Sequence, residues 1–126
     1  MKKIYISSPY RTTQKEAVPA AKELARNLRL ARKGCRMAID RGFIPVAPHL
    51  FFPQFLNEES EREIGLELGA ELLKECDELW ILGSRISDGM ADEISYARDL
   101  GIFVRVMENP MTTNERVIKA IKEGEA

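Results

Sequence analysis

Residues 85–97, RISDGMADEISYA, place two neighbouring acids, Asp92 and Glu93, in the first turns of a predicted helix. Such a carboxylate is either a solvated acid that complements the helix dipole or a group that does chemistry. Glu93 flanks the apolar stripe of this helix, so we expect it to face the crevice beside the sheet. Asp92 points roughly 100° away on a helix of 3.6 residues per turn, which indicates a surface or interface residue.

The loop before this helix has the composition of an anion-binding site. Ser87, Asp88 and Gly89 combine short capping side chains, exposed backbone N–H groups and little bulk at the positive end of the helix dipole. A plain helix cap by Ser87 or Asp88 is the commoner use of such residues. The loop has neither the P-loop spacing of glycine and lysine nor the GxGxxG pattern of dinucleotide folds, so both interpretations stay open.

Two residues that follow the first predicted strand could also bind an anion. Ser8 carries a hydroxyl and Arg11 a guanidinium, and a guanidinium holds phosphate through charge-assisted hydrogen bonds. The alternative for Arg11 is an exposed loop arginine without a ligand.

Three more residues have a structural and a functional interpretation. Tyr5 lies inside the first strand and can simply pack there, but a carboxylate across the crevice would satisfy its buried hydroxyl. His49 makes either a structural hydrogen bond or a contact with a sugar or base. Asp77 opens the third predicted strand and is most simply a strand-start residue.

The composition is that of a soluble globular protein. Its 126 residues predict one domain over residues 1–126, with 44% hydrophobic and 31% charged residues. A formal net charge of −1 gives no basic field for a nucleic acid polymer or an acidic membrane surface. The first residues, KKIYIS, contain no apolar h-region and the sequence has no apolar run of ~18 residues, so we expect a cytoplasmic protein. Cys35 and Cys76 lie far apart in the sequence, and the chain has a single histidine. This composition predicts buried free thiols and no metal site.

Short β-rich runs alternate with longer helical segments along the chain. The predicted strands are residues 3–7, 43–47, 77–83 and 102–107, and the predicted helices are residues 16–41, 58–76, 88–100 and 112–124. Residues 48–56 are predicted to form an aromatic loop punctuated by proline. Pro45 predicts an edge strand, and the third strand is expected to be central.

The apolar spacing also predicts which side of two helices is buried. In the helix over residues 16–41 the apolar stripe consists of Ala21, Leu24, Ala25, Leu28, Ala31, Cys35, Ala38 and Ile39. In the helix over residues 58–76 it consists of Ile64, Leu68 and Leu72, with Gly65 and Gly69 beside it.

The order of elements predicts an α/β fold: a single flavodoxin- or Rossmann-like domain with a parallel sheet of four to five strands and helices on both faces. Ligands of such sheets bind beyond the carboxyl ends of the strands, where the strand order reverses. This rule gathers residues 7–11, 47–52 and 83–90 around one expected site.

Four segments resemble the nucleoside 2-deoxyribosyltransferase-like superfamily, which includes the deoxynucleoside 5′-monophosphate N-glycosidases. They are KIYIS, PHLFFPQFL, CDELWILG and ISDGMADEISYA, and the likeness covers most of residues 3–107. Within the superfamily, the chain is most similar to a branch of small uncharacterised bacterial and phage proteins.

The resemblance implies roles for the residues singled out above. Glu93, in EISYA, matches the family nucleophile, and Ser87 and Gly89 match the spacing of the 5′-phosphate loop of the glycosidase branch. Tyr5 matches a tyrosine that contacts the nucleophile, and Arg11 matches an arginine that helps to hold phosphate.

Two further residues match the family pattern, and two segments depart from it. One of these is the PHLFFPQFL loop, which is unlike that of the better-known transferases. Asp77 matches an aspartate with a part in catalysis near the leaving base, and His49 matches a histidine found after strand two in some members. The first strand ends in SSPYR rather than in the glycine-rich form typical of the glycosidases.

The activity implied is cleavage of an N-glycosidic bond with retention, on a nucleoside or nucleoside 5′-monophosphate and without a cofactor. Glu93 would attack C1′ as the base leaves, Asp77 or Asp88 would supply a proton or hydrogen bond to the base, and water or a second base would complete hydrolysis or transfer. Relatives are dimers or larger, so a homo-oligomer is expected. The alternatives are a non-catalytic nucleotide-binding module, as a sensor or sponge, and a purely structural oligomerising protein.

Overall fold

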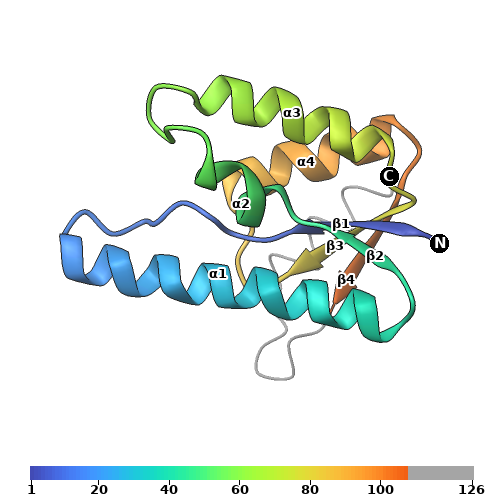
Figure 1. Cartoon of the computed structure of the whole chain (residues 1–126), viewed down its shortest axis with the longest axis horizontal. Helices are drawn as coiled ribbons and strands as arrows, with labels where there is room; N and C mark the ends of the chain where they lie inside the picture. The colour runs from blue at the N-terminus through green and yellow to red at the C-terminus, as the bar shows by residue number, and fades with distance from the viewer. Residues whose placement is uncertain (108–126) are drawn as a thin grey trace.

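A parallel sheet of four strands forms the centre of the protein (Figure 1). The computed structural model describes residues 1–107, and the helix predicted over residues 112–124 lies outside them. The strands are β1 (Lys3–Ser7), β2 (Ile44–Val46), β3 (Glu78–Leu82) and β4 (Phe103–Met107), in the order β2-β1-β3-β4. Every neighbouring pair is parallel, which confirms the predicted α/β fold. β2 is an edge strand, as Pro45 predicts, and β3 is paired on both sides.

Helices cover both faces of this sheet. They are α1 (Ala17–Asp40), α2 (Pro48–Phe51), the 3-10 helix η1 (Phe52–Gln54), α3 (Arg62–Lys74) and α4 (Asp88–Asp99). Helix α1 lies along one face, whereas α3 and α4 lie on the other (Figure 1). No helix within residues 1–107 is both long and apolar enough to span a bilayer.

The two faces of the sheet bury separate cores. Ile4, Ile6, Trp80 and Leu82 pack with Ala38 of α1. On the other face, Tyr5, Leu79 and Ile81 pack with α3 and α4. This alternation follows from the period of two in a strand. Cys76 is buried and Cys35 half-buried, and both are free thiols.

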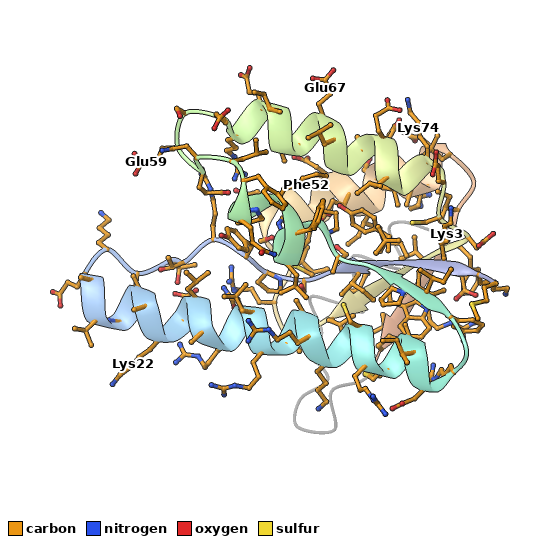
Figure 2. All side chains as sticks on the ribbon, viewed as in Figure 1. Lys3, Lys22, Phe52, Glu59, Glu67 and Lys74 are labelled. Carbon is orange, nitrogen blue, oxygen red and sulfur yellow. The ribbon has the colours of Figure 1, made fainter. Side chains whose placement is uncertain are left out.

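Ile39, in the last turn of α1, is 52% exposed although the predicted stripe includes it. The buried side of α1 also differs from the predicted stripe in the first turns of the helix. Ala21 and Ala25 are exposed there, while Glu23 and Asn27 are buried. The reason is length: the 24 residues of α1 extend over about 36 Å, roughly twice the span of a five-residue strand. Its first half therefore lies beyond the sheet against the polar loop that follows β1, and Lys22 points away from the molecule (Figure 2).

The predicted stripe of α3 is also wrong. Ile64 and Leu68 are 45% and 39% exposed, whereas Gly69 and Leu73 are buried. A Cβ at Gly69 would lie only 3.5 Å from the Tyr5 hydroxyl, so the helix approaches β1 through its small residues. Glu67 lies on the outer side of α3 (Figure 2).

The segment expected to be an aromatic loop instead forms helical turns. Residues 48–54 build α2 and η1, and Pro48 stands at the start of α2, where a proline needs no N–H partner. Helix α3 begins later than predicted, because Asn57 Oδ1 accepts hydrogen bonds from the backbone N–H groups of Glu59 and Ser60 at 3.0 and 3.1 Å. These bonds close a turn before the helix.

Gly83 ends β3 and directs the chain toward residues 84–87. Its φ of +99° is unfavourable for any residue with a side chain, and a Cβ there would meet Leu30 Cδ2 at 2.7 Å. We expect Gly83→Ala to lower the free energy of unfolding by about 2 kcal/mol, measured by urea denaturation. Gly101→Ala is the matched control, since Gly101 also has a positive φ but no atom within 4 Å of a Cβ, and should cost about 1 kcal/mol. An equal loss in both variants would contradict the predicted clash with Leu30.

Candidate active site

A cleft of about 690 Å³ opens at the carboxyl ends of β1 and β3, between the loop after β1, helices α2 and α3, and the start of α4. This volume lies within the range of small-molecule sites, roughly 300–1,000 Å³. Seven residues singled out from the sequence line it: Tyr5, Arg11, His49, Ser87, Asp88, Gly89 and Glu93.

Glu93 is held in the cleft by both its helix and β1. Met90, Ile94 and Ala97 are buried and anchor α4 on the sheet, which leaves Glu93 on the flank of the helix. Ser7 Oγ donates a hydrogen bond to Glu93 Oε1 at 3.2 Å. The neighbouring Asp92 is exposed at the rim of the cleft, so the two acids differ as expected.

The surroundings of Glu93 favour its neutral form. Burial raises its pKa from 4.5 to about 7, although interactions with the hydroxyls of Tyr5 and Ser7 act in the opposite direction. The nearby charge of Asp92 also contributes to the increase. A carboxylate with this pKa is only partly ionised at neutral pH, which is typical of catalytic groups.

Tyr5 and Glu93 affect each other's protonation. The pKa of Tyr5 is raised strongly by burial and further by the Glu93 carboxylate. Because the Tyr5 hydroxyl favours the charged form of Glu93, we expect Tyr5→Phe to move the pKa of Glu93 above about 7. A 13C NMR titration of the Glu93 carboxyl group in both proteins measures this shift. An unchanged or lower pKa in the variant would show that the hydroxyl does not stabilise the carboxylate.

The start of α4 is capped as the sequence suggested. Ser87 Oγ accepts a hydrogen bond from the Met90 N–H at 3.2 Å. Gly89 adds no side chain over the cleft, and a Cβ there would have only Ser87 Oγ nearby, at 4.0 Å. The first N–H groups of a helix have no acceptor within it, so this end can receive an anion. The cap and the anion site are therefore compatible interpretations.

His49 and Arg11 contact other residues of the cleft. The ring of His49 stacks on Tyr10 with 5.1 Å between centroids and 18° between planes. Burial and the charge of Arg62 lower the pKa of His49 to about 4, so its imidazole is neutral at physiological pH. Arg11 is half exposed and pairs with Glu58 at 3.8 Å.

Two predicted site residues lie outside the cleft. Asp77 is at the amino end of β3, where its Oδ2 accepts a hydrogen bond from the Lys3 N–H at 2.7 Å. It therefore cannot reach a substrate in the cleft, which lies at the carboxyl ends of the strands. Ser8 is buried away from the cleft, and its hydroxyl has no partner within the described residues.

The sequence interpretation also missed two residues that belong to the site. Ser7 is two positions after Tyr5, and the alternation of a strand places both on the side of α4, whereas Ser8 falls on the other side. That alternation would have identified Ser7. Arg85 also lines the cleft, and nothing in its spacing distinguished it from an exposed loop arginine.

The strand order and the helices on both faces define the class of the protein, an α/β fold with a parallel sheet. The structure matches a 2-deoxyribosyltransferase from the psychrotolerant bacterium Bacillus psychrosaccharolyticus with a TM-score of 0.60 and 21% identity, over 86% of this chain and 78% of that chain. It also matches a conserved protein from Enterococcus faecalis V583 with a TM-score of 0.51 and 22% identity, over 98% of this chain and 76% of that one. At 21% and 22% identity, these matches show that the fold is similar and nothing beyond the fold.

The chain belongs to the family described as a domain of unknown function (DUF7768), whose family model matches residues 2–107. No curated protein matches the sequence.

Proposed function

We propose that this protein cleaves or transfers the N-glycosidic bond of a nucleoside or nucleoside 5′-monophosphate, with Glu93 as the nucleophile. One observation carries the proposal: a carboxylate with a raised pKa lies in a small-molecule cleft, hydrogen-bonded to Ser7 and next to Tyr5. The fold shared with a 2-deoxyribosyltransferase supports the same class of chemistry.

In the proposed reaction, a Glu93 oxygen forms a bond to C1′ while the electron pair of the C–N bond leaves with the base. The result is a glycosyl-enzyme ester, formed through an oxocarbenium-like transition state that the carboxylate charge stabilises. Attack on C1′ by water then gives hydrolysis, and attack by a second base gives transfer. Ser7 and Tyr5 hold the carboxylate in place.

The departing base needs a proton or a hydrogen bond. Asp88 is the candidate for this role, because it lines the cleft in the first turn of α4 whereas Asp77 does not reach it. The neutral imidazole of His49, stacked on Tyr10, can donate a hydrogen bond to the base or sugar and can also accept one from it.

The test is to incubate the protein with the common deoxynucleosides, ribonucleosides and their 5′-monophosphates, and to detect free base by chromatography. A second base added to the mixture distinguishes transfer from hydrolysis. Release of base from at least one substrate is expected. No release and no exchange with any substrate would contradict the proposal, and nucleotide binding without turnover would favour the non-catalytic module.

A further inference from the structure

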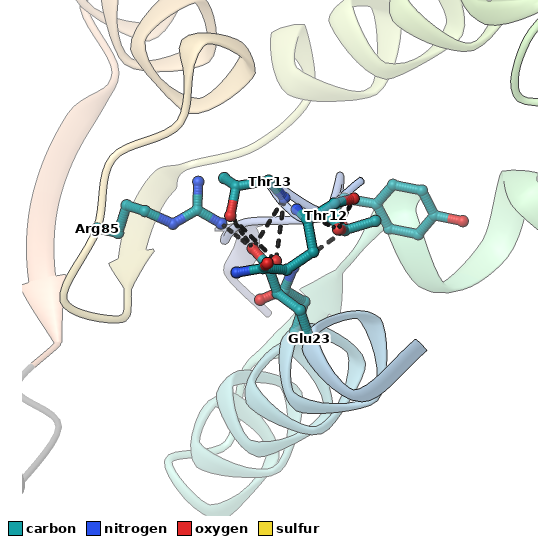
Figure 3. Close-up of polar contacts among 7 residues, drawn as sticks. Thr12, Thr13, Glu23 and Arg85 are labelled. Carbon is teal, nitrogen blue, oxygen red and sulfur yellow. Dashed lines mark hydrogen bonds and ion pairs between the residues drawn. The ribbon is translucent and has the colours of Figure 1, made fainter. Parts of the chain in front are cut away.

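A buried acid outside the cleft connects two of its loops. Glu23, in the second turn of α1, is only 8% exposed. Its carboxylate accepts hydrogen bonds from the Thr13 backbone N–H at 3.0 and 3.1 Å and from Thr13 Oγ1 at 3.1 Å. Its Oε1 also lies 3.4 Å from Arg85 Nη2 (Figure 3). The carboxylate therefore joins the loop after β1 to the loop after β3.

The loop after β1 is held to α1 at a second point. Asn27, one turn after Glu23, donates a hydrogen bond from Nδ2 to the Tyr10 carbonyl at 3.1 Å. Tyr10, Thr13 and Arg85 all line the cleft, whereas Glu23 does not. The first half of α1 thus supports the wall of the cleft from behind.

The contacts of Glu23 keep its carboxylate charged. Burial alone would raise its pKa, but the hydrogen bonds of Thr13 and the charge of Arg85 outweigh that effect and hold the pKa below its ordinary value. A buried carboxylate with partners on both oxygens has little freedom to move. It therefore fixes the guanidinium that it contacts.

Arg85 has capacity for a ligand. A guanidinium carries five N–H donors, and within residues 1–107 Glu23 is the acceptor that Arg85 contacts. Its position two residues before Ser87 places it next to the start of α4. Arg11 and Arg62 both pair with Glu58 instead, at 3.8 and 3.6 Å, and the Glu58 side chain is 41% exposed whereas that of Glu23 is 10% exposed.

We propose that Glu23 is a positioning residue that fixes Arg85 and the loop after β1 as a preformed anion subsite for the 5′-phosphate of a nucleoside monophosphate. The choice of a nucleotide ligand rests on the proposed function. The resemblance gave the phosphate to Ser87 with help from Arg11, whereas the geometry favours Arg85 as the arginine because Glu23 holds its charge at the cleft wall.

The test is isothermal titration calorimetry, in which each common deoxynucleoside and its 5′-monophosphate are titrated into the protein. The measured quantity is the dissociation constant, so the test does not require turnover. Wild type should bind a monophosphate more tightly than its nucleoside. Glu23→Gln and Arg85→Gln should each weaken monophosphate binding about tenfold, the effect expected for one charge-assisted contact, and leave nucleoside binding unchanged. The double variant should be no weaker than Arg85→Gln, because Glu23 acts through Arg85.

Asp40→Asn is the matched control, since it breaks an ion pair with Arg36 on the same helix and should change neither affinity. Equal losses for nucleoside and monophosphate in Glu23→Gln would indicate a merely structural role and overturn the proposal. So would additive losses in the double variant, or a wild type that binds both ligands equally or neither. Failure of the proposed function is distinguishable, because monophosphate binding with this pattern but without base release would contradict only the catalytic proposal.

Discussion

Replacing Glu93 with glutamine is expected to reduce base release at least about a thousandfold, because an amide oxygen cannot form the glycosyl ester. The side chain keeps nearly the same size, and its oxygen can still accept the hydrogen bond from Ser7. Nucleotide binding should therefore persist. The measurement is the rate of free-base formation with the best substrate of the panel, together with calorimetry of the same ligand.

Asp92→Asn is the matched control for this result. Asp92 is the adjacent acid on the same helix but is exposed at the rim of the cleft, so its loss should change the rate by no more than a few-fold. If Glu93→Gln retained wild-type activity, or if Asp92→Asn were the inactive variant, the assignment of the nucleophile would be wrong.

The same Glu93→Gln variant is expected to be more stable than wild type at alkaline pH. A carboxyl group whose pKa is raised by folding stabilises the protein below its ordinary pKa of 4.5, and this stability is lost as the pH rises through about 7. Glutamine does not titrate, so it avoids that loss. At about 1.4 kcal/mol per pKa unit, the advantage of the variant should grow by roughly 3 kcal/mol between pH 4.5 and pH 8.

Urea denaturation of both proteins at several pH values measures this difference. Asp99→Asn serves as the control here, because Asp99 is an exposed acid at the far end of the same helix and its removal should give little dependence of the stability difference on pH. A constant difference between wild type and Glu93→Gln across the range would show that Glu93 has no raised pKa in the folded protein. The expected pattern means that the ionised carboxylate is kept at a cost to stability.

The order of strands and helices could be predicted from the sequence because it depends on local apolar periodicity. The burial of particular helix faces could not, because it depends on what each turn packs against. Glu23 and Asn27 are buried since the start of α1 extends past the sheet onto a polar loop. Ile64 and Leu68 are exposed since α3 approaches β1 through its small residues.

The same distinction applies to the cleft. The rule for the carboxyl ends of parallel strands gathered the segments of Arg11, His49 and Ser87, and these three residues line one cleft. Asp77 could have been excluded by that rule, because it opens a strand rather than ends one. The role proposed for Arg85 could not have been predicted, since it rests on an ion pair with Glu23, a residue 62 positions away in the chain.

The bond between Ser7 and Glu93 joins residues 86 positions apart in the chain. Closing a loop of that length carries an entropic cost, and in the folded protein the contact stands beside the parallel pairing of β1 with β3. An amino-terminal fragment that emerges first during synthesis therefore contains β1 and α1 but no carboxylate beside Ser7. Only a chain with the native topology should therefore bind a ligand in this cleft. A bound nucleotide should raise the stability of the whole sheet rather than of one segment.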